Sequence, residues 1–206
     1  MIIKVHTQVK RGCFFLLFIL FYQVSFAQKK AYRDSLIEYQ QNYIATHEVV
    51  GKQDKKYIGF YDIDESYRVT ASFEKLDDKE GFDMNTSAGI KQKYFEYGLL
   101  SFRLHDSLLH LHVYQSKDLM KQKKYKEYLF VPFGDATSGF ESYGGGRYID
   151  FYIPAIKNNE VVIDFNKAYN PYCAYTIGYA CPIPPLENLL TAPITAGEKN
   201  YGKKIH

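Results

Sequence analysis

The sequence predicts a mainly β (α+β) fold in which one antiparallel sheet is curled into a sandwich or barrel. Short runs of β-branched and aromatic residues, separated by turn-forming residues, occupy most of the chain between residues 57 and 166. No helical pattern interrupts these runs, and consecutive strands without crossover helices form antiparallel sheets. The chain has 206 residues, 46% of them hydrophobic, which suits one substantial core and excludes a disordered chain.

Residues 1–27 have the pattern of a secretory signal peptide. Basic residues precede an unbroken apolar run at residues 13–22, and Ser25 and Ala27 place small residues where a signal peptidase reads the chain. The run is about half of the roughly 20 residues that span a bilayer, although an uncleaved anchor of similar composition is the alternative. We therefore expect an exported protein, periplasmic or secreted, with no membrane insertion after cleavage and residues 28–206 as a single β-rich domain.

The charge of the chain argues against two classes of partner. Lys and Arg number 26 against 23 Asp and Glu, and the excess of three comes from Lys4, Lys10 and Arg11 in the signal-like segment. The remaining chain is balanced, which disfavours electrostatic binding of nucleic acid or of an anionic membrane.

The predicted elements follow the signal-like segment in order. Residues 29–47 carry apolar groups at helical spacing, which predicts one amphipathic helix at the start of the domain. The predicted strands are residues 57–61, 67–73, 93–104, 108–114, 127–133, 147–153 and 160–166. Proline and glycine are frequent from residue 169 onward, so we expect an irregular tail that packs on the body through its leucines and isoleucines.

Two cysteines, Cys173 and Cys181, follow the signal-like segment with seven residues between them. In an oxidising compartment such an isolated pair indicates a disulfide, which would add about 2.5 to 3 kcal/mol to stability in the chain-entropy model. The alternative is that Cys173 is a reactive thiol, although no C-x-x-C or metal-type spacing supports that interpretation.

The sequence predicts no metal site and no cofactor. His110 and His112 share one face of the predicted strand 108–114, and alternate histidines on a strand can bind a metal. Nothing in the sequence nominates a third ligand, so a solvated outer face is the favoured interpretation.

Three glycines, at residues 144–146, precede Arg147. Their backbone N–H groups, together with the guanidinium, could hold an anion. The favoured alternative is a tight turn that needs positive φ, because the segment lacks the Lys-Ser/Thr of a phosphate loop and opens no helix.

The strands 147–153 and 160–166 are expected to pair as a hairpin, and their polar faces carry Asp150 and Asp164. In one register the two carboxylates face each other, which requires a cation between them or a proton on one of them. Two separately paired acids are the alternative.

Five motifs follow one another toward the end of the chain. They are FVPFGDATSG (130–139), SYGGGRYID (142–150), DFNKAYNPYCAY (164–175), CPIPPLENLL (181–190) and AGEK (196–199). In this order they resemble the domain-of-unknown-function family 1684 of bacterial and archaeal proteins, over most of the chain after the signal-like segment. The family supplies no activity. The resemblance implies these candidate ligand-binding residues: Tyr143, Arg147, Asp150, Asp164, Asn166, Asn170, Glu187, Asn188, Glu198 and Lys199.

Two functions from different classes fit these features. The first is a structural accessory module, or one that binds a small polar or anionic molecule on a tyrosine-lined face capped by the tail; that face carries Tyr148, Tyr152, Asp150, Asp164 and Asn166. The second is a hydrolase-type enzyme with Asp150 or Asp164 as base, Arg147 as anion clamp and, in one variant, Cys173 as nucleophile. The first is favoured because no complete catalytic constellation can be assembled.

A third possibility gives the motifs a purely architectural role. Side-chain caps, prolines and a buried Arg–carboxylate pair would then fasten the irregular tail to the body. No protein partner is predicted.

Overall fold

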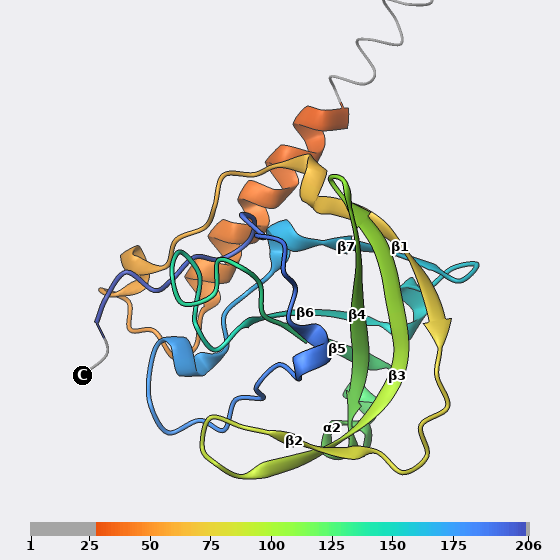
Figure 1. Ribbon diagram of the computed structural model, residues 1–206. Coiled ribbons are helices and arrows are strands. Elements are labelled where there is room, and N and C mark those ends of the chain that lie inside the picture. The colour runs from red at the N-terminus through yellow and green to blue at the C-terminus, as the bar shows by residue number, and fades with distance from the viewer. Residues whose placement is uncertain (1–27, 205–206) are drawn as a thin grey trace, which may run out of the picture. The chain divides into compact units, whose positions relative to one another are not determined.

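A seven-stranded antiparallel sheet dominates the computed structural model, which describes residues 28–204 (Figure 1). The strands are β1 (Arg68–Lys75), β2 (Phe82–Asn85), β3 (Lys91–Leu104), β4 (Ser107–Ser116), β5 (Tyr128–Phe133), β6 (Arg147–Tyr152) and β7 (Glu160–Asp164). Their order is β6-β5-β4-β3-β1-β7, and β2 pairs with β3 beside this path. The predicted mainly β fold with one curled antiparallel sheet is confirmed.

Helical structure is limited in the described residues. Residues 28–46 are helical, close to the predicted 29–47, and α2 (Lys117–Met120) is a single turn that the sequence analysis did not predict. Single 3₁₀ turns lie at Lys55–Tyr57, Glu65–Tyr67, Lys123–Tyr125, Ile153–Ala155, Phe165–Lys167, Tyr172–Ala174 and Leu186–Asn188. Within residues 28–204, no helix is long and apolar enough to cross a membrane.

The described chain falls into two compact units, residues 28–41 and residues 42–204, and the whole sheet belongs to the second. Long strands β3 and β4 run side by side through the middle of this sheet (Figure 1). A bulge between Glu96 and Gly98 shifts the register of β3 against β4. A Cβ at Gly98 would lie 2.4 Å from the ring of Phe73, so only glycine allows β1 and β3 this close approach.

One expected strand is absent and one strand was missed. The expected strand 57–61 is wrong, because Tyr57 ends a 3₁₀ turn and Phe60 makes a single isolated bridge to Glu198. Ile58 is buried in a separate cluster with Val50 and Tyr175, away from the sheet. The short strand β2 was not predicted, since only Met84 of its residues is buried.

The predicted hairpin between residues 147–153 and 160–166 is also wrong. β6 pairs with β5, whereas β7 pairs with β1 at the other end of the strand order. The buried residues of β7, Val161 and Ile163, lie opposite Ala71 and Val69 of β1. Because this pairing buries the apolar faces of both strands together, Asp150 and Asp164 do not face each other.

The C-terminal segment packs on the sheet through fewer residues than expected. Leu190 and Ile194 are buried in the main core, together with Leu111, Phe133 and Phe165. Three other tail residues expected to pack on the body are exposed: Ile183, Leu186 and Leu189. The irregular tail is confirmed, since between residues 169 and 204 the described chain forms only 3₁₀ turns and isolated bridges.

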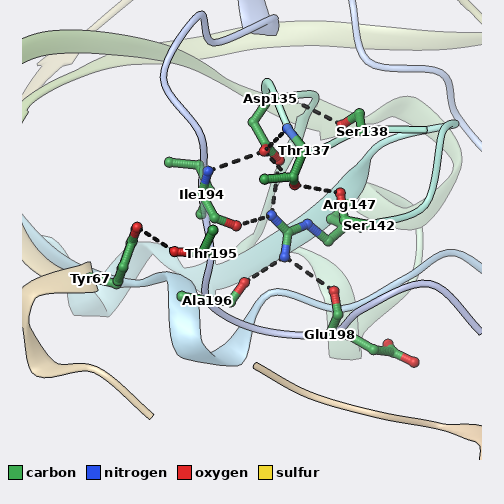
Figure 2. A network of polar contacts seen from close by, with 10 residues as sticks. All are labelled: Tyr67, Asp135, Thr137, Ser138, Ser142, Arg147, Ile194, Thr195, Ala196 and Glu198. Carbon is green, nitrogen blue, oxygen red and sulfur yellow. Dashed lines mark hydrogen bonds and ion pairs between the residues drawn. The ribbon is translucent and has the colours of Figure 1, made fainter. Parts of the chain in front are cut away.

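Arg147 fastens this segment to β6 (Figure 2). Its side chain is 0% exposed, and Nη2 donates to Asp135 Oδ2 at 2.9 Å and to the Ile194 carbonyl at 2.7 Å. Nη1 donates to the carbonyls of Ala196 and Glu198. Both terminal nitrogens of the guanidinium are therefore occupied within the protein, and Arg147 is not placed to clamp an anionic ligand.

The other oxygen of Asp135 completes the network. Asp135 Oδ1 accepts hydrogen bonds from the Thr137 backbone and hydroxyl and from the Ile194 N–H. Thr137 in turn shares a hydrogen bond with Ser142, which is also buried. The buried Arg–carboxylate pair thus has the architectural role that the sequence analysis left open.

Removing the charge of Asp135 should destabilise the protein strongly. We expect Asp135→Asn to lower the free energy of unfolding by about 3–5 kcal/mol, because the guanidinium would stay buried without a compensating charge. Urea-induced unfolding measures this change. Asp118→Asn, which removes a carboxylate from the exposed pair with Lys121, is the matched control and should change stability little. Equal effects of the two substitutions would contradict the prediction.

Candidate functional site

A pocket of about 540 Å³ lies within the second unit, between residues 43–48, the β5–β6 strands and two stretches of the tail. This volume is typical of small-molecule sites. Tyrosines dominate the lining: Tyr43, Tyr94, Tyr128, Tyr148, Tyr169, Tyr172 and Tyr179. The other lining residues are Thr46, His47, Glu48, Leu119, Phe130, Asn170, Pro171, Ala180, Cys181 and Pro182.

Side chains of β5 and β6 point alternately to the two faces of the sheet, and those on one face form a wall of the pocket. Val131 and Ile149 point into the main core, so their neighbours Phe130 and Tyr148 point to the opposite face. Tyr148 packs edge-to-face against Phe130, with ring centroids 4.7 Å apart, and against Tyr169 at 5.8 Å. A backbone bridge between Tyr148 and Tyr169 fixes the start of the tail against β6.

The tail supplies the opposite wall through a closed loop. Cys173 and Cys181 form a disulfide, and Cys181 itself lines the pocket. Tyr179 lies within this loop and Tyr172 directly precedes it. Their ring centroids are 5.1 Å apart in an edge-to-face arrangement. The disulfide therefore holds two lining tyrosines near each other.

Several tyrosine hydroxyls of the pocket donate to carboxylates. Asp150 Oδ2 accepts from Tyr128 at 2.7 Å and from Tyr169 at 3.2 Å. On the tail side, Tyr172 donates to Glu48 Oε2 at 3.1 Å. These bonds fix the rings and leave the hydroxyls without a free proton for a ligand.

Glu198 lies behind the pocket and is fully buried. Its carboxylate accepts hydrogen bonds from the hydroxyls of Tyr43 and Tyr175 and from the backbone N–H of Asn170. Burial raises the pKa of Glu198 to about 7, although these donors favour the charged form. The group therefore titrates near neutral pH.

His47 is buried beside the pocket, packed among the rings of Tyr43, Tyr172 and Tyr175. Burial, reinforced by the charge of Lys55, lowers the pKa of His47, so the imidazole is neutral at neutral pH. Neither ring nitrogen has a hydrogen-bond partner among the described residues. A buried polar group without a partner in a lined pocket is the arrangement expected where a ligand supplies the missing bond.

Of the candidate residues proposed from the sequence, some lie at the pocket and others fasten the tail to the sheet. Asn170 lines the pocket, and Asp150 and Glu198 hold its tyrosine hydroxyls. Asn188 is buried and bonds to both backbone groups of His112 and to the carbonyl of Pro132, which clamps the tail to β4 and β5. Its role is therefore architectural.

The remaining candidates lie outside the pocket lining. Asp164 accepts from the Asn166 backbone and side chain, and Asn166 also bonds to Asp64, so this pair shapes a turn. Glu187 accepts from the Tyr114 hydroxyl, and Lys199 Nζ lies 4.9 Å from the centre of the Tyr61 ring.

The three glycines at residues 144–146 form a tight turn, which is the interpretation that the sequence favoured over an anion site. Gly146 has a φ of +83° and closes onto the Tyr143 carbonyl, and a Cβ at Gly146 would lie 2.5 Å from Pro184. Tyr143 is half-buried in the small cluster around Tyr175. Only glycine fits this approach of the tail to β6.

No metal centre is found in residues 28–204, where no group of three or more His, Cys, Asp or Glu side chains could hold an ion. His110 bonds to Ser101 and His112 contacts Glu96, so each histidine meets a side chain of the neighbouring strand β3.

Sequence reasoning missed most of the pocket. His47, Tyr94 and Tyr128 belong to no recognised motif and come from three separate parts of the chain. The available signal was the composition, because 20 of 206 residues are tyrosine. A count cannot say which of these rings converge.

The pKa of Glu198 makes stability depend on pH. A carboxyl with a higher pKa in the folded state binds its proton more tightly there, so the free energy of unfolding falls as pH rises from about 4.5 to about 7. We expect this loss to be about 3 kcal/mol and to be absent in Glu198→Gln. Thermal unfolding of both proteins from about pH 5 to about pH 8 measures the difference.

Glu187→Gln is the matched control for this experiment, because its exposed carboxylate also accepts a tyrosine hydroxyl. Glu198→Gln should alter the pH profile of unfolding more than this control does. Parallel profiles for wild type and Glu198→Gln would contradict the titration of Glu198.

The chain resembles known proteins over most of its length. Residues 54–199 match the family described as "Protein of unknown function (DUF1684)", which confirms the resemblance seen in the motifs. The solution NMR structure of an uncharacterized protein of Haloarcula marismortui is similar, with a TM-score of 0.60 and 31% identity, over 84% of this chain and 92% of that one. No curated protein matches the chain. The protein therefore belongs to the DUF1684 family, whose function is unknown.

Proposed function

We propose that this protein is a binding module that takes a small molecule into the tyrosine-lined pocket. The observation that carries the proposal is His47, whose two buried ring nitrogens have no hydrogen-bond partner among the described residues. The pocket volume, its aromatic walls and its few convergent polar groups support the same function. Tyrosine suits such a site because it combines apolar area with a polar hydroxyl.

The hydrolase alternative has less support. Arg147 is enclosed in the ion pair with Asp135, the sulfur of Cys173 is in the disulfide, and Asp164 shapes a turn next to β7. These groups would have to converge on one substrate to act together. Asp150 is held by the hydroxyls of Tyr128 and Tyr169, two residues of the pocket lining.

We also propose that the protein works outside the cytoplasm as a mature chain beginning near Gln28. The signal-like pattern of residues 1–27 supports export, and the Cys173–Cys181 bond is of the kind that persists in oxidising compartments.

Intact mass spectrometry after alkylation tests export and the disulfide together. The protein recovered outside the cytoplasm should have the mass of a chain cut near Gln28, and Cys173 and Cys181 should be alkylated only after reduction. Removal of Cys13 with the signal-like segment makes these two the remaining thiols of the mature sequence. A full-length mass in the cell would contradict export, and alkylation without reduction would contradict the disulfide.

Filling the pocket should abolish ligand binding. Ala180 lines the pocket, so Ala180→Phe is expected to remove the saturation-transfer NMR signals that wild type gives with a library of small neutral, cationic and anionic fragments. Ile177→Phe adds the same ring to the same loop at a residue that is 80% exposed and outside the lining, and it should keep the signals. An absence of fragment binding, or binding that survives Ala180→Phe, would overturn the proposed function.

A further inference from the structure

We propose that the ligand of this pocket is a small organic cation of the tertiary or quaternary ammonium class. The inference rests on the proposed function and specifies its ligand. Three features carry it: aromatic walls, carboxylates that accept hydrogen bonds from the wall tyrosines, and the absence of Lys and Arg from the lining that the described residues provide.

The aromatic walls supply the attraction. Tyr94, Phe130, Tyr148 and Tyr169 form a continuous series in which each ring lies within 5.9 Å of the next, measured between centroids. Tyr43 continues the series from Tyr169 at 6.4 Å. The face of an aromatic ring attracts a cation through its quadrupole, and this attraction is largest where water is excluded.

The carboxylates make these rings better partners for a cation. Asp150 accepts from Tyr128 and Tyr169, Glu198 from Tyr43, and Glu48 from Tyr172. A phenol that donates to a carboxylate is polarised toward the phenolate, so electron density on its ring rises. Glu48 places its carboxylate in the lining itself, and Asp150 places its carboxylate next to the lining tyrosines that donate to it.

An anionic ligand has no donor of the required kind here. Four of the lining hydroxyls donate to carboxylates, and the hydroxyl of Tyr148 donates to the Pro182 carbonyl. Anion sites use Arg or Lys side chains, and the arginine proposed from the sequence as an anion clamp, Arg147, is enclosed in the ion pair with Asp135. Of the small polar or anionic ligands expected from the sequence, the anionic class therefore does not fit this pocket.

His47 fits the same ligand class. The lowered pKa keeps the imidazole neutral, so it adds no positive charge to the lining. One ring nitrogen can then accept a hydrogen bond from an N–H or a hydroxyl of the ligand, and the other can donate one. A cation that carries a hydroxyl would satisfy the aromatic walls and this buried imidazole together.

Two probes of the same shape, one cationic and one neutral, distinguish the effect of charge on affinity from the effect of shape. Choline and 3,3-dimethylbutan-1-ol differ in that a quaternary nitrogen replaces a quaternary carbon, so shape and hydroxyl are conserved. In isothermal titration calorimetry of the mature protein, choline is expected to bind at least about tenfold more tightly than the neutral alcohol. Equal affinities, or no binding of choline, would overturn the cation inference.

Substitutions at Tyr172 test whether the rings are responsible. Tyr172→Leu should weaken choline binding severalfold, whereas Tyr172→Phe, which keeps the ring, should retain most of it. Tyr57→Leu is the matched control, because Tyr57 is 38% exposed against 37% for Tyr172 and lies outside the lining. Identical choline affinities for all three variants would contradict the role of the ring.

The two proposals fail in different ways. If the fragment library binds in a manner blocked by Ala180→Phe while choline shows no preference over its neutral isostere, the binding module stands and the ligand class is wrong. If no fragment binds at all, the proposed function fails and the ligand class with it.

Discussion

The buried ion pair between Arg147 and Asp135 is the interaction on which the rest of the structure depends. Arg147 begins β6, and its guanidinium holds the carbonyls of residues 194, 196 and 198 in the otherwise irregular tail. A chain segment without regular secondary structure has few backbone partners of its own, so buried side chains must supply them. Once this segment is fixed, Glu198 is placed behind Tyr43 and Asn170, and one side of the pocket is set.

The pocket combines groups that are costly to bury separately. Glu198 is enclosed, yet three donors surround its carboxylate, and His47 is enclosed with both ring nitrogens unpaired among the described residues. Polar groups without partners are rare in protein interiors, and those that occur gather at functional sites. The fold therefore supplies partners for the Glu198 carboxylate, whereas it supplies none among the described residues for the His47 ring nitrogens.

The motif-rich end of the chain serves mainly to attach the tail. Asn188 joins it to β4 and β5, the three glycines let it approach β6, and the disulfide closes the loop that carries Tyr179. These residues place the pocket walls without lining them, with the exception of Cys181. The same motifs also carry part of the pocket lining, including Phe130, Tyr148 and Tyr169.

The sequence by itself determined the fold class, six of the seven strands that the structure describes, and the irregular tail, because alternation of apolar residues and clusters of proline and glycine are local signals. It also indicated Asp150, Asn170 and Glu198 as candidates. Only the tertiary structure decided that β7 pairs with β1, that Arg147 meets Asp135, and which tyrosines converge with His47. Strand partners and pocket walls come from residues far apart in sequence, and their pairing depends on how whole apolar faces are buried together.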